Sequence, residues 1–169
     1  MAEQMLIDLR TLLVEKEDCD AGTVQQLRNG LSQGNQQFKN LREVCQLLQK
    51  KVEGTTGPQQ KKFQLKYGIA LYFLGHTEKA VENLKHGESS LAHFYLGKAL
   101  LSMQDSDEAL KAFEKAEKLG YNPSQVQLQK IAIQRIKGHG TQAKSALAKL
   151  EELSSHSAEF HYQKAGILA

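Results

Sequence analysis

The sequence is poor in the residues that cross-link or interrupt a small fold. Among its 169 residues there are two cysteines, two prolines and no tryptophan. Cys19 and Cys45 are too few for a disulfide framework and too far apart for a CxxC motif, so we expect two reduced thiols, with Cys45 on a buried helix face. Leu, Lys, Gln, Glu and Ala dominate over β-branched residues, which excludes a β-sandwich or barrel and predicts an all-α fold.

Long apolar runs and a strong charge of one sign are also absent. No apolar run approaches the length of about 18 residues that a transmembrane helix needs, and the N-terminal stretch carries acids without a small-residue cleavage site. We therefore expect a soluble, cytoplasmic protein with no membrane insertion. The formal net charge is only +3, too weak for a nucleic-acid partner, which needs clustered Lys and Arg. It fits a solvated helical surface with a slight preference for acidic partners.

No arrangement of reactive side chains indicates an enzyme. The six histidines are scattered, and no two stand at the i, i+4 spacing that would aim both at one metal ion. Gly138-His139-Gly140 follows no predicted strand and lacks the Lys-Ser/Thr of a phosphate-binding loop, so it predicts a turn. The sequence therefore predicts no catalytic residue, no metal and no cofactor.

The region before Pro58 is expected to be helical. A first helix, roughly Glu3 to Glu17, is marked on one face by Leu6, Leu9 and Leu13. Asp20 is a candidate N-cap for the helix that follows.

From Val24 to Val52 the apolar residues follow a heptad spacing. Two interpretations compete: one long helix that forms a coiled coil with a second chain, or two helices that break near Gly34-Asn35 and fold back as an N-terminal cap. Gly30 and Gly34 would each weaken a helix interior by about 1 kcal/mol relative to Ala. We therefore favour the broken, cap-like arrangement.

Beyond Pro58 the sequence repeats itself. In each unit a small residue or its substitute is followed twelve residues later by alanine and then, four residues further, by a large apolar residue. The period predicts helix pairs that stack because each pair alone leaves an apolar face exposed. The small residue would let the second helix cross closely, and the large residue would fill the gap to the next pair. The units are Gly68-Ala80-Leu84, Gly97-Ala109-Phe113 and Ile131-Ala143-Leu147, with a fourth that begins at Ala158 and places Ala165 at the glycine offset.

The second copy, Leu91 to Pro123, closely resembles a tetratricopeptide repeat. Gly97, Leu100, Ala109, Phe113, Ala116 and the closing proline stand at the family's spacing. The resemblance covers roughly Lys61 to Ala169 and implies a right-handed α-solenoid of helix hairpins behind N-terminal capping or coiled-coil helices. The glycines and the proline of residues 54–58 break any helix and divide the chain into two regions, an N-terminal helical segment, residues 1–57, and a repeat domain, residues 58–169. The repeats are expected at about 61–89, 90–123, 124–157 and a partial 158–169, whose unfinished form favours an N-terminal fragment of a longer repeat protein.

The resemblance also implies a concave groove lined by the first helix of each pair. Its floor would be apolar, with Phe94, Leu101 and Tyr72 as anchors, and Lys98 and Arg135 would orient acidic groups. The expected occupant is a peptide or helix with large apolar and acidic side chains. Alternatively, the N-terminal helices cover part of this stripe. The groove residues predicted in this way are Lys62, Leu65, Ile69, Tyr72, Leu91, Phe94, Lys98, Leu101, Gln125, Leu128, Arg135 and Tyr162.

The predicted function is a non-catalytic protein-binding scaffold or adaptor. One alternative is a small chaperone of the secretion type, which such a chain resembles in size and repeat number. Another is a homodimeric structural subunit that self-associates through residues 24–52. The clamp by which one tetratricopeptide class holds chaperone tails is not matched, because its Lys, Asn and Arg positions are occupied here by Leu65, Ile69, Tyr95, Leu128 and Ala132.

Overall fold

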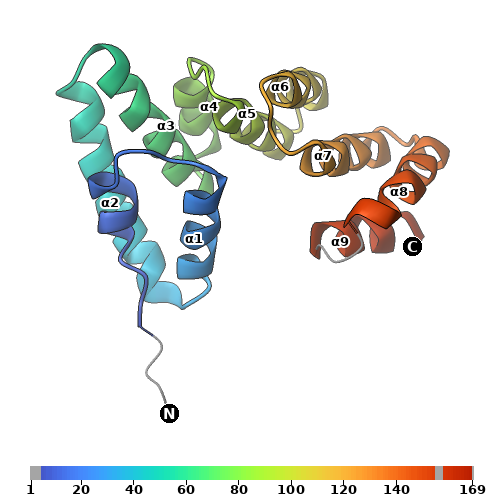
Figure 1. The fold of residues 1–169 in the computed structure, drawn as a ribbon, viewed down its shortest axis with the longest axis horizontal. Helices are drawn as coiled ribbons and strands as arrows, with labels where there is room; N and C mark the ends of the chain where they lie inside the picture. The colour runs from blue at the N-terminus through green and yellow to red at the C-terminus, as the bar shows by residue number, and fades with distance from the viewer. Residues whose placement is uncertain (1–4, 155–157, 169) are drawn as a thin grey trace.

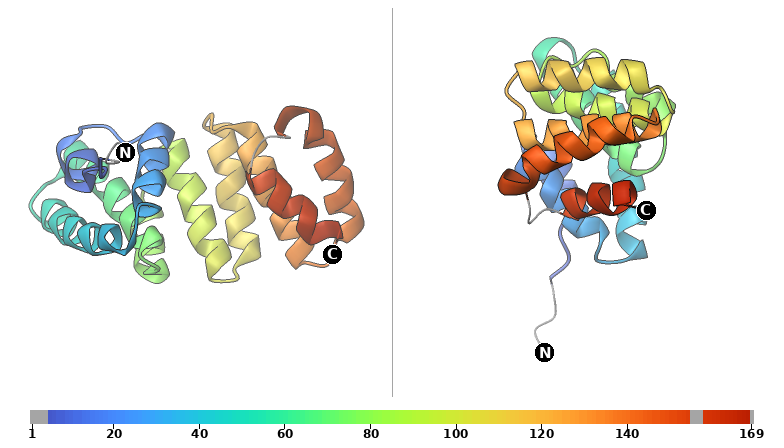
Figure 2. Two further views of the ribbon diagram at one scale, coloured as in Figure 1. Left: turned by 90° about the horizontal axis from the view of Figure 1, so that it is seen from below. Right: turned by 90° about the vertical axis from the view of Figure 1, so that its right-hand side faces the viewer.

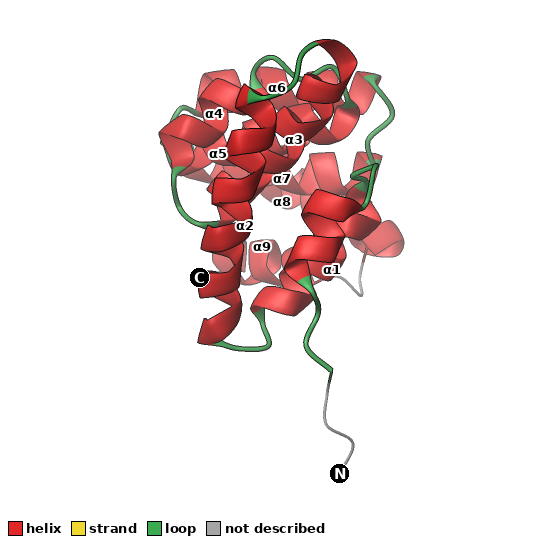
Figure 3. Ribbon diagram, turned by 90° about the vertical axis from the view of Figure 1, so that its left-hand side faces the viewer, coloured by secondary structure: helices red, strands yellow, loops and turns green. Residues whose placement is uncertain are grey.

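The computed structural model describes residues 5–154 and 158–168, and within these ranges the regular structure is helical, with no strand (Figure 3). The predicted all-α fold is confirmed. In chain order the elements are a π-helical turn (Thr11–Glu15) and the helices α1 (Ala21–Leu31), α2 (Asn35–Glu53), α3 (Gly57–Phe73), α4 (Thr77–Leu84), α5 (Ser90–Ser102), α6 (Ser106–Lys118), α7 (Pro123–Ile136), α8 (Gly140–Ser154) and α9 (Ala158–Leu168).

Consecutive helices pack against each other to form an α-solenoid of hairpins. The pairs α3/α4, α5/α6 and α7/α8 follow one another along an arc, and Figure 2 shows the same helices side by side in one array. Figure 1 shows α1 near one end of the arc and α9 near the other, both on its inner side. No helix in the described ranges is long and apolar enough to cross a membrane.

The first predicted helix starts later than expected. Residues 5–8 are not helical, and the helical turns begin at Leu9. The reason is the Asp8 side chain, whose Oδ1 accepts hydrogen bonds from the backbone N–H of Arg10 at 3.0 Å and of Thr11 at 3.2 Å, as an N-cap does. Leu9 and Leu13 are buried as predicted, whereas Leu6 lies before the helix and is 57% exposed. Residues 3 and 4, which the prediction included, lie outside the described residues.

The heptad segment is broken into two helices, as favoured. Asp20 is the predicted N-cap of α1, since its Oδ1 accepts a hydrogen bond from the Thr23 N–H at 2.8 Å. The chain breaks between Leu31 and Asn35, where Gly34 has a φ of 136°, a conformation that suits glycine. The alternative prediction of a single long coiled-coil helix is therefore wrong. Its apolar stripe is buried inside the chain instead, at Val24, Leu27, Leu41, Cys45 and Leu48.

The buried apolar residues form two cores. The larger one runs without interruption from Leu9 through α1–α6 to Ile133 of α7. The smaller one belongs to α7 and α8 and contains Leu128, Ile131 and Leu147 with two neighbours. The N-terminal helices therefore share a core with the first two hairpins.

The glycines of the first two hairpins allow close helix crossing. A Cβ atom on Gly68 would lie 2.7 Å from the Leu84 side chain, and one on Gly97 would lie 2.7 Å from the Phe113 ring. Both distances are too short for a methyl group, so the large residue packs directly over the glycine of its own hairpin. The expectation that Leu84 and Phe113 serve the gap to the next pair is corrected accordingly.

Candidate functional site

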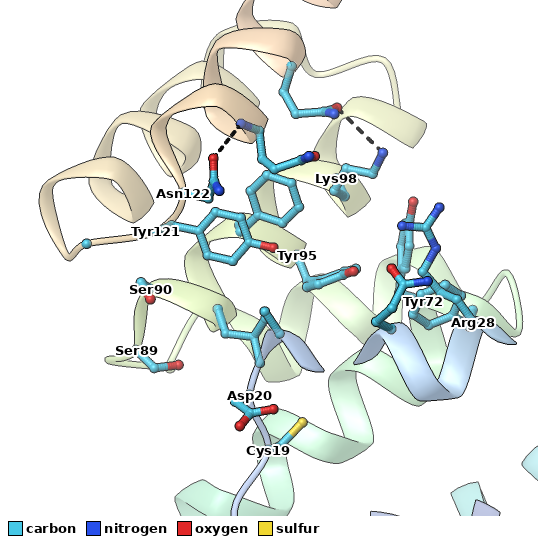
Figure 4. A pocket seen from close by; sticks show the side chains of 18 of the residues that line it. Cys19, Asp20, Arg28, Tyr72, Ser89, Ser90, Tyr95, Lys98, Tyr121 and Asn122 are labelled. Atoms are coloured by element: carbon cyan, nitrogen blue, oxygen red, sulfur yellow. Dashed lines mark hydrogen bonds between the residues drawn. The ribbon is translucent and has the colours of Figure 1, made fainter. Parts of the chain in front are cut away.

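The inner side of the arc contains a groove with a volume of about 950 Å³. One wall is the connection into α1 and one face of that helix, and the floor and the other wall come from α3, α5, α7 and α9 (Figure 4). We call it the central groove. Its lining residues are Cys19, Asp20, Ala21, Gln25, Arg28, Tyr72, Phe73, Ser89, Ser90, Leu91, Phe94, Tyr95, Lys98, Gly120, Tyr121, Asn122, Gln125, Gln129 and Tyr162.

Aromatic rings form the floor of the central groove. Phe94 stacks on Tyr121, with ring centroids 4.1 Å apart and planes 13° apart. Tyr95 makes edge contacts with Phe94 at 5.5 Å and with Tyr72 at 5.6 Å. Burial raises the pKa of both Tyr95 and Tyr121 above the usual range, so both hydroxyls are neutral at physiological pH. The floor is therefore a fixed apolar surface that carries neutral hydroxyl groups.

Three helices begin at the rim of the groove, and the side chain of the residue before each helix caps its N-terminus. Asp20 caps α1, Ser89 Oγ accepts from the Ala92 N–H at 3.1 Å at the start of α5, and Asn122 Oδ1 accepts from the Gln125 N–H at 3.2 Å at the start of α7. Hydrogen bonds from the Thr23 N–H and hydroxyl lower the pKa of Asp20. These caps fix the groove walls without a ligand.

Two cations line the central groove, one on the α1 wall and one on the repeat side. Lys98 of α5 donates to Gln129 Oε1 of α7 at 3.5 Å. Arg28 of α1 makes no ion pair with any carboxylate in the described part of the chain, and its charge opposes the rise in the pKa of Tyr95 and Tyr121. The positive field of Arg28 thus extends over the aromatic floor. The one carboxylate in the lining, that of Asp20, is engaged by its own helix.

The sequence profile of the tetratricopeptide repeat family matches residues 90–122, the segment that contains α5 and α6. Residues 90–122 are a tetratricopeptide repeat. No curated protein and no solved structure matches the chain. Tetratricopeptide repeats generally serve protein–protein interaction, and this one supplies the centre of the groove floor through Leu91, Phe94, Tyr95 and Lys98.

The structure brings together one set of the predicted groove residues around this tetratricopeptide repeat. Leu91 and Phe94 are each only 5% exposed, so only a small part of each side chain is accessible to a ligand. Tyr162 of α9 is 66% exposed and stands at the far end. The predicted residues that line the central groove are Tyr72, Leu91, Phe94, Lys98, Gln125 and Tyr162.

Residues 16–20, which we call the N-terminal strap, cover the first hairpin. Lys62 Nζ lies 3.0 Å from Glu17 Oε1 and 3.3 Å from Asp18 Oδ1, and the Lys66 amine donates to the Lys16 carbonyl oxygen. Lys62 is therefore engaged by the chain itself and does not line the central groove. The expected alternative named the N-terminal helices, whereas the connection before α1 covers this part of the predicted stripe.

Five further predicted residues lie outside the central groove. Ile69 and Leu128 are 0% exposed and serve as core residues, so their assignment to the groove is corrected. Leu65 and Leu101 are half-buried against the larger core. Arg135 lies beside the groove, where its guanidinium donates to Gln163 and sits 5.7 Å from the Tyr162 ring centroid. The prediction extended one helical register along all first helices, and neighbouring helices bury part of that register.

Most of the lining residues that the prediction missed belong to the α1 wall and to the turn before α7. The others are Phe73, Ser89, Ser90, Tyr95 and Gln129. Asp20 could be identified as an N-cap from the sequence, but nothing local shows that the helix it starts will border a groove with Gln25 and Arg28. Cys19 also lines the groove, and burial raises the pKa of its thiol to about 11, so it stays protonated and is a poor nucleophile. No cluster of three His, Cys, Asp or Glu in the described ranges could hold a metal ion.

Proposed function

We propose that the protein is a non-catalytic scaffold that holds a segment of a partner protein in the central groove. The observation that carries this proposal is the groove itself, about 950 Å³ with an aromatic floor and cations on two sides. The tetratricopeptide repeat at residues 90–122 supports a protein as the partner. The occupant is an extended or helical segment that carries large apolar and acidic side chains.

The lining suits such a segment physically. Tyr72, Tyr95 and Tyr162 offer ring surface and hydroxyl groups at low cost in side-chain entropy. An apolar anchor that fills such a site typically contributes about 2 kcal/mol or more to binding. The internal caps and stacked rings fix the floor before binding, which lowers the ordering cost.

A steric block tests this function independently of charge. Gln25 on α1 and Gln125 on α7 line the groove, so Gln25→Trp/Gln125→Trp should fill its mouth. A matched control is Gln46→Trp/Gln59→Trp, because both of these glutamines are exposed and lie outside the lining. A random peptide library is selected on the wild-type protein, and the recovered peptides are measured on both variants by fluorescence anisotropy after circular dichroism has confirmed their helicity.

The proposal expects that the groove variant loses at least tenfold in affinity and that the control binds like the wild type. Equal affinity for all three proteins would place the binding surface elsewhere. A failure to recover any peptide that the groove variant weakens would contradict the proposal in the same way.

A further inference from the structure

We infer that α1, which lies outside the tetratricopeptide repeat, sets the selectivity of the central groove through Arg28. In this arrangement Arg28 on α1 and Lys98 on α5 select a partner segment in which carboxylates flank a large apolar side chain. The inference rests on the proposed function and deepens it, since it names the chemistry of the partner and the residue that selects it.

The α1 wall is built as a fixed part of the groove. Val24 and Leu27 are 2% and 0% exposed in the larger core, and the capping box of Asp20 and Thr23 holds the first turn. The groove-lining residues Ala21, Gln25 and Arg28 follow at steps of four and three, which places them on one face of the helix. Arg28 is therefore held at the groove by a helix that is anchored on its other face.

Arg28 is a lining cation that forms no ion pair with a carboxylate of the described residues. A guanidinium carries five N–H donors in a plane that matches a carboxylate. The acidic residue that lines the groove, Asp20, accepts hydrogen bonds from the Thr23 N–H and hydroxyl. A carboxylate from a partner is the group that complements this site.

The other cations of the inner surface are already engaged. Lys62 pairs with Glu17 and Asp18, and the Arg135 guanidinium donates to Gln163. The Lys98 amine is also in contact with a side chain, since it donates to the amide oxygen of Gln129. The preference for acid is therefore assigned to Arg28 first and to Lys98 second.

Two tyrosine rings line the groove together with these two cations. Figure 4 shows Arg28, Tyr72, Tyr95 and Lys98 around the same opening. Tyr72 and Tyr95 are in edge contact at 5.6 Å, so they form a continuous surface for a large aliphatic or aromatic side chain. The expected ligand pattern is thus acid, apolar residue, acid along one segment.

The experiment uses the peptides recovered in the library selection, each paired with an analogue in which every Asp and Glu is replaced by Asn and Gln. Both are titrated against the wild type, Arg28→Glu and the matched control Arg42→Glu, which reverses an exposed arginine of α2 outside the groove. We expect that Arg28→Glu weakens the acidic peptides about tenfold or more, that the neutral analogues bind both proteins equally, and that Arg42→Glu changes neither. Added salt should reduce the difference.

Two results would overturn the inference while leaving the function intact. One is a set of peptides that the tryptophan block weakens but that contains no excess of Asp and Glu. The other is an equal loss of affinity for Arg28→Glu and Arg42→Glu, which would show a general charge effect. If instead the tryptophan block itself has no effect, the proposed function fails and not only the role of α1.

Discussion

The hairpins α5/α6 and α7/α8 are both pairs of packed helices, but they differ in the residue at the point where the two helices meet. In α5/α6 the first helix has a glycine, Gly97, and the Phe113 ring lies 2.7 Å from where a Cβ would be. In α7/α8 the same offset carries Ile131, which is 1% exposed and packs with Leu147 in a core of its own. In α5/α6 the absence of a side chain at Gly97 thus lets the Phe113 ring of the second helix pack directly on the first helix. In α7/α8 the Ile131 side chain fills the space between the two helices instead. Of these two hairpins, the tetratricopeptide profile matches α5/α6.

This difference matters for the central groove. Phe113 contacts Phe94, with ring centroids 5.5 Å apart, and Phe94 stacks on Tyr121. Gly97 therefore positions the aromatic floor through a chain of rings. The α7/α8 hairpin contributes polar lining, Gln125 and Gln129, which does not depend on such a chain.

The largest expected effect comes from giving α7/α8 the glycine of its neighbour. Ile131→Gly removes a buried side chain and adds helix-weakening glycine, so the free energy of unfolding should fall by about 3–5 kcal/mol. Guanidinium denaturation followed by circular dichroism measures this loss. Hydrogen exchange should show that protection is lost in α7 and α8 and retained in α5 and α6, because Ile131 packs in the smaller core and not in the larger one. A loss below about 1 kcal/mol would show that α7/α8 can close as α5/α6 does.

The next effect comes from a single methyl group in α5/α6. Gly97→Ala places a Cβ 2.7 Å from the Phe113 ring, and this overpacking should cost about 1–3 kcal/mol despite the better helix propensity of alanine. The control is Gly140→Ala, since a Cβ there has no neighbour within 4 Å. It should leave the denaturation midpoint unchanged or slightly raised. Equal behaviour of the two variants would refute the ring-over-glycine packing.

A smaller effect is expected at α9, where a glycine also faces a side chain. A Cβ on Gly166 would meet the guanidinium end of Arg135, which is flexible and can move. Gly166→Ala should therefore stay within about 0.5 kcal/mol of the wild type. Destabilisation as large as that of Gly97→Ala would mean that the Arg135 contact with Gln163 is structurally essential.

The smallest effect is a pH dependence specific to α5/α6. His93 is 4% exposed, and burial, with Lys115 nearby, lowers its pKa below the ordinary value of about 6.5. Below about pH 6.5 the His93 imidazole binds a proton more readily in the unfolded chain than in the folded one. The contribution of neutral His93 to the free energy of unfolding is therefore fully present above about pH 6.5 and decreases as the pH falls. The corresponding residue of α7, Gln127, does not titrate. His93→Gln should reduce the acid sensitivity of unfolding, and an unchanged pH profile would exclude His93 as its source.

Much of this fold could be predicted from the sequence because it repeats. The offsets from Gly68, Gly97 and Ile131 predicted the three hairpins, and the glycines predicted the break before Asn35. The start of the first helix was missed because the Asp8 cap overrides the apolar pattern from Leu6.

The candidate site was predicted only in part, for a physical reason. Helical register was enough to expect Tyr72, Phe94 and Lys98 on the face that lines the central groove, because their positions depend on local geometry within the first helices. Burial of Ile69 and Leu128, and the approach of Arg28 from α1, depend on contacts between segments far apart in the chain. No local pattern encodes those contacts.

The most direct test of the central claim is site-specific photo-crosslinking in cells, with benzoylphenylalanine at Gln25 or Gln125 in the groove and at Gln46 or Gln59 outside it. The account predicts that both groove positions crosslink to one short partner segment that contains apolar and acidic residues, as mapped by mass spectrometry, and that Arg28→Glu weakens these crosslinks. Crosslinks to a partner from Gln46 or Gln59, with none from Gln25 and Gln125, would contradict it.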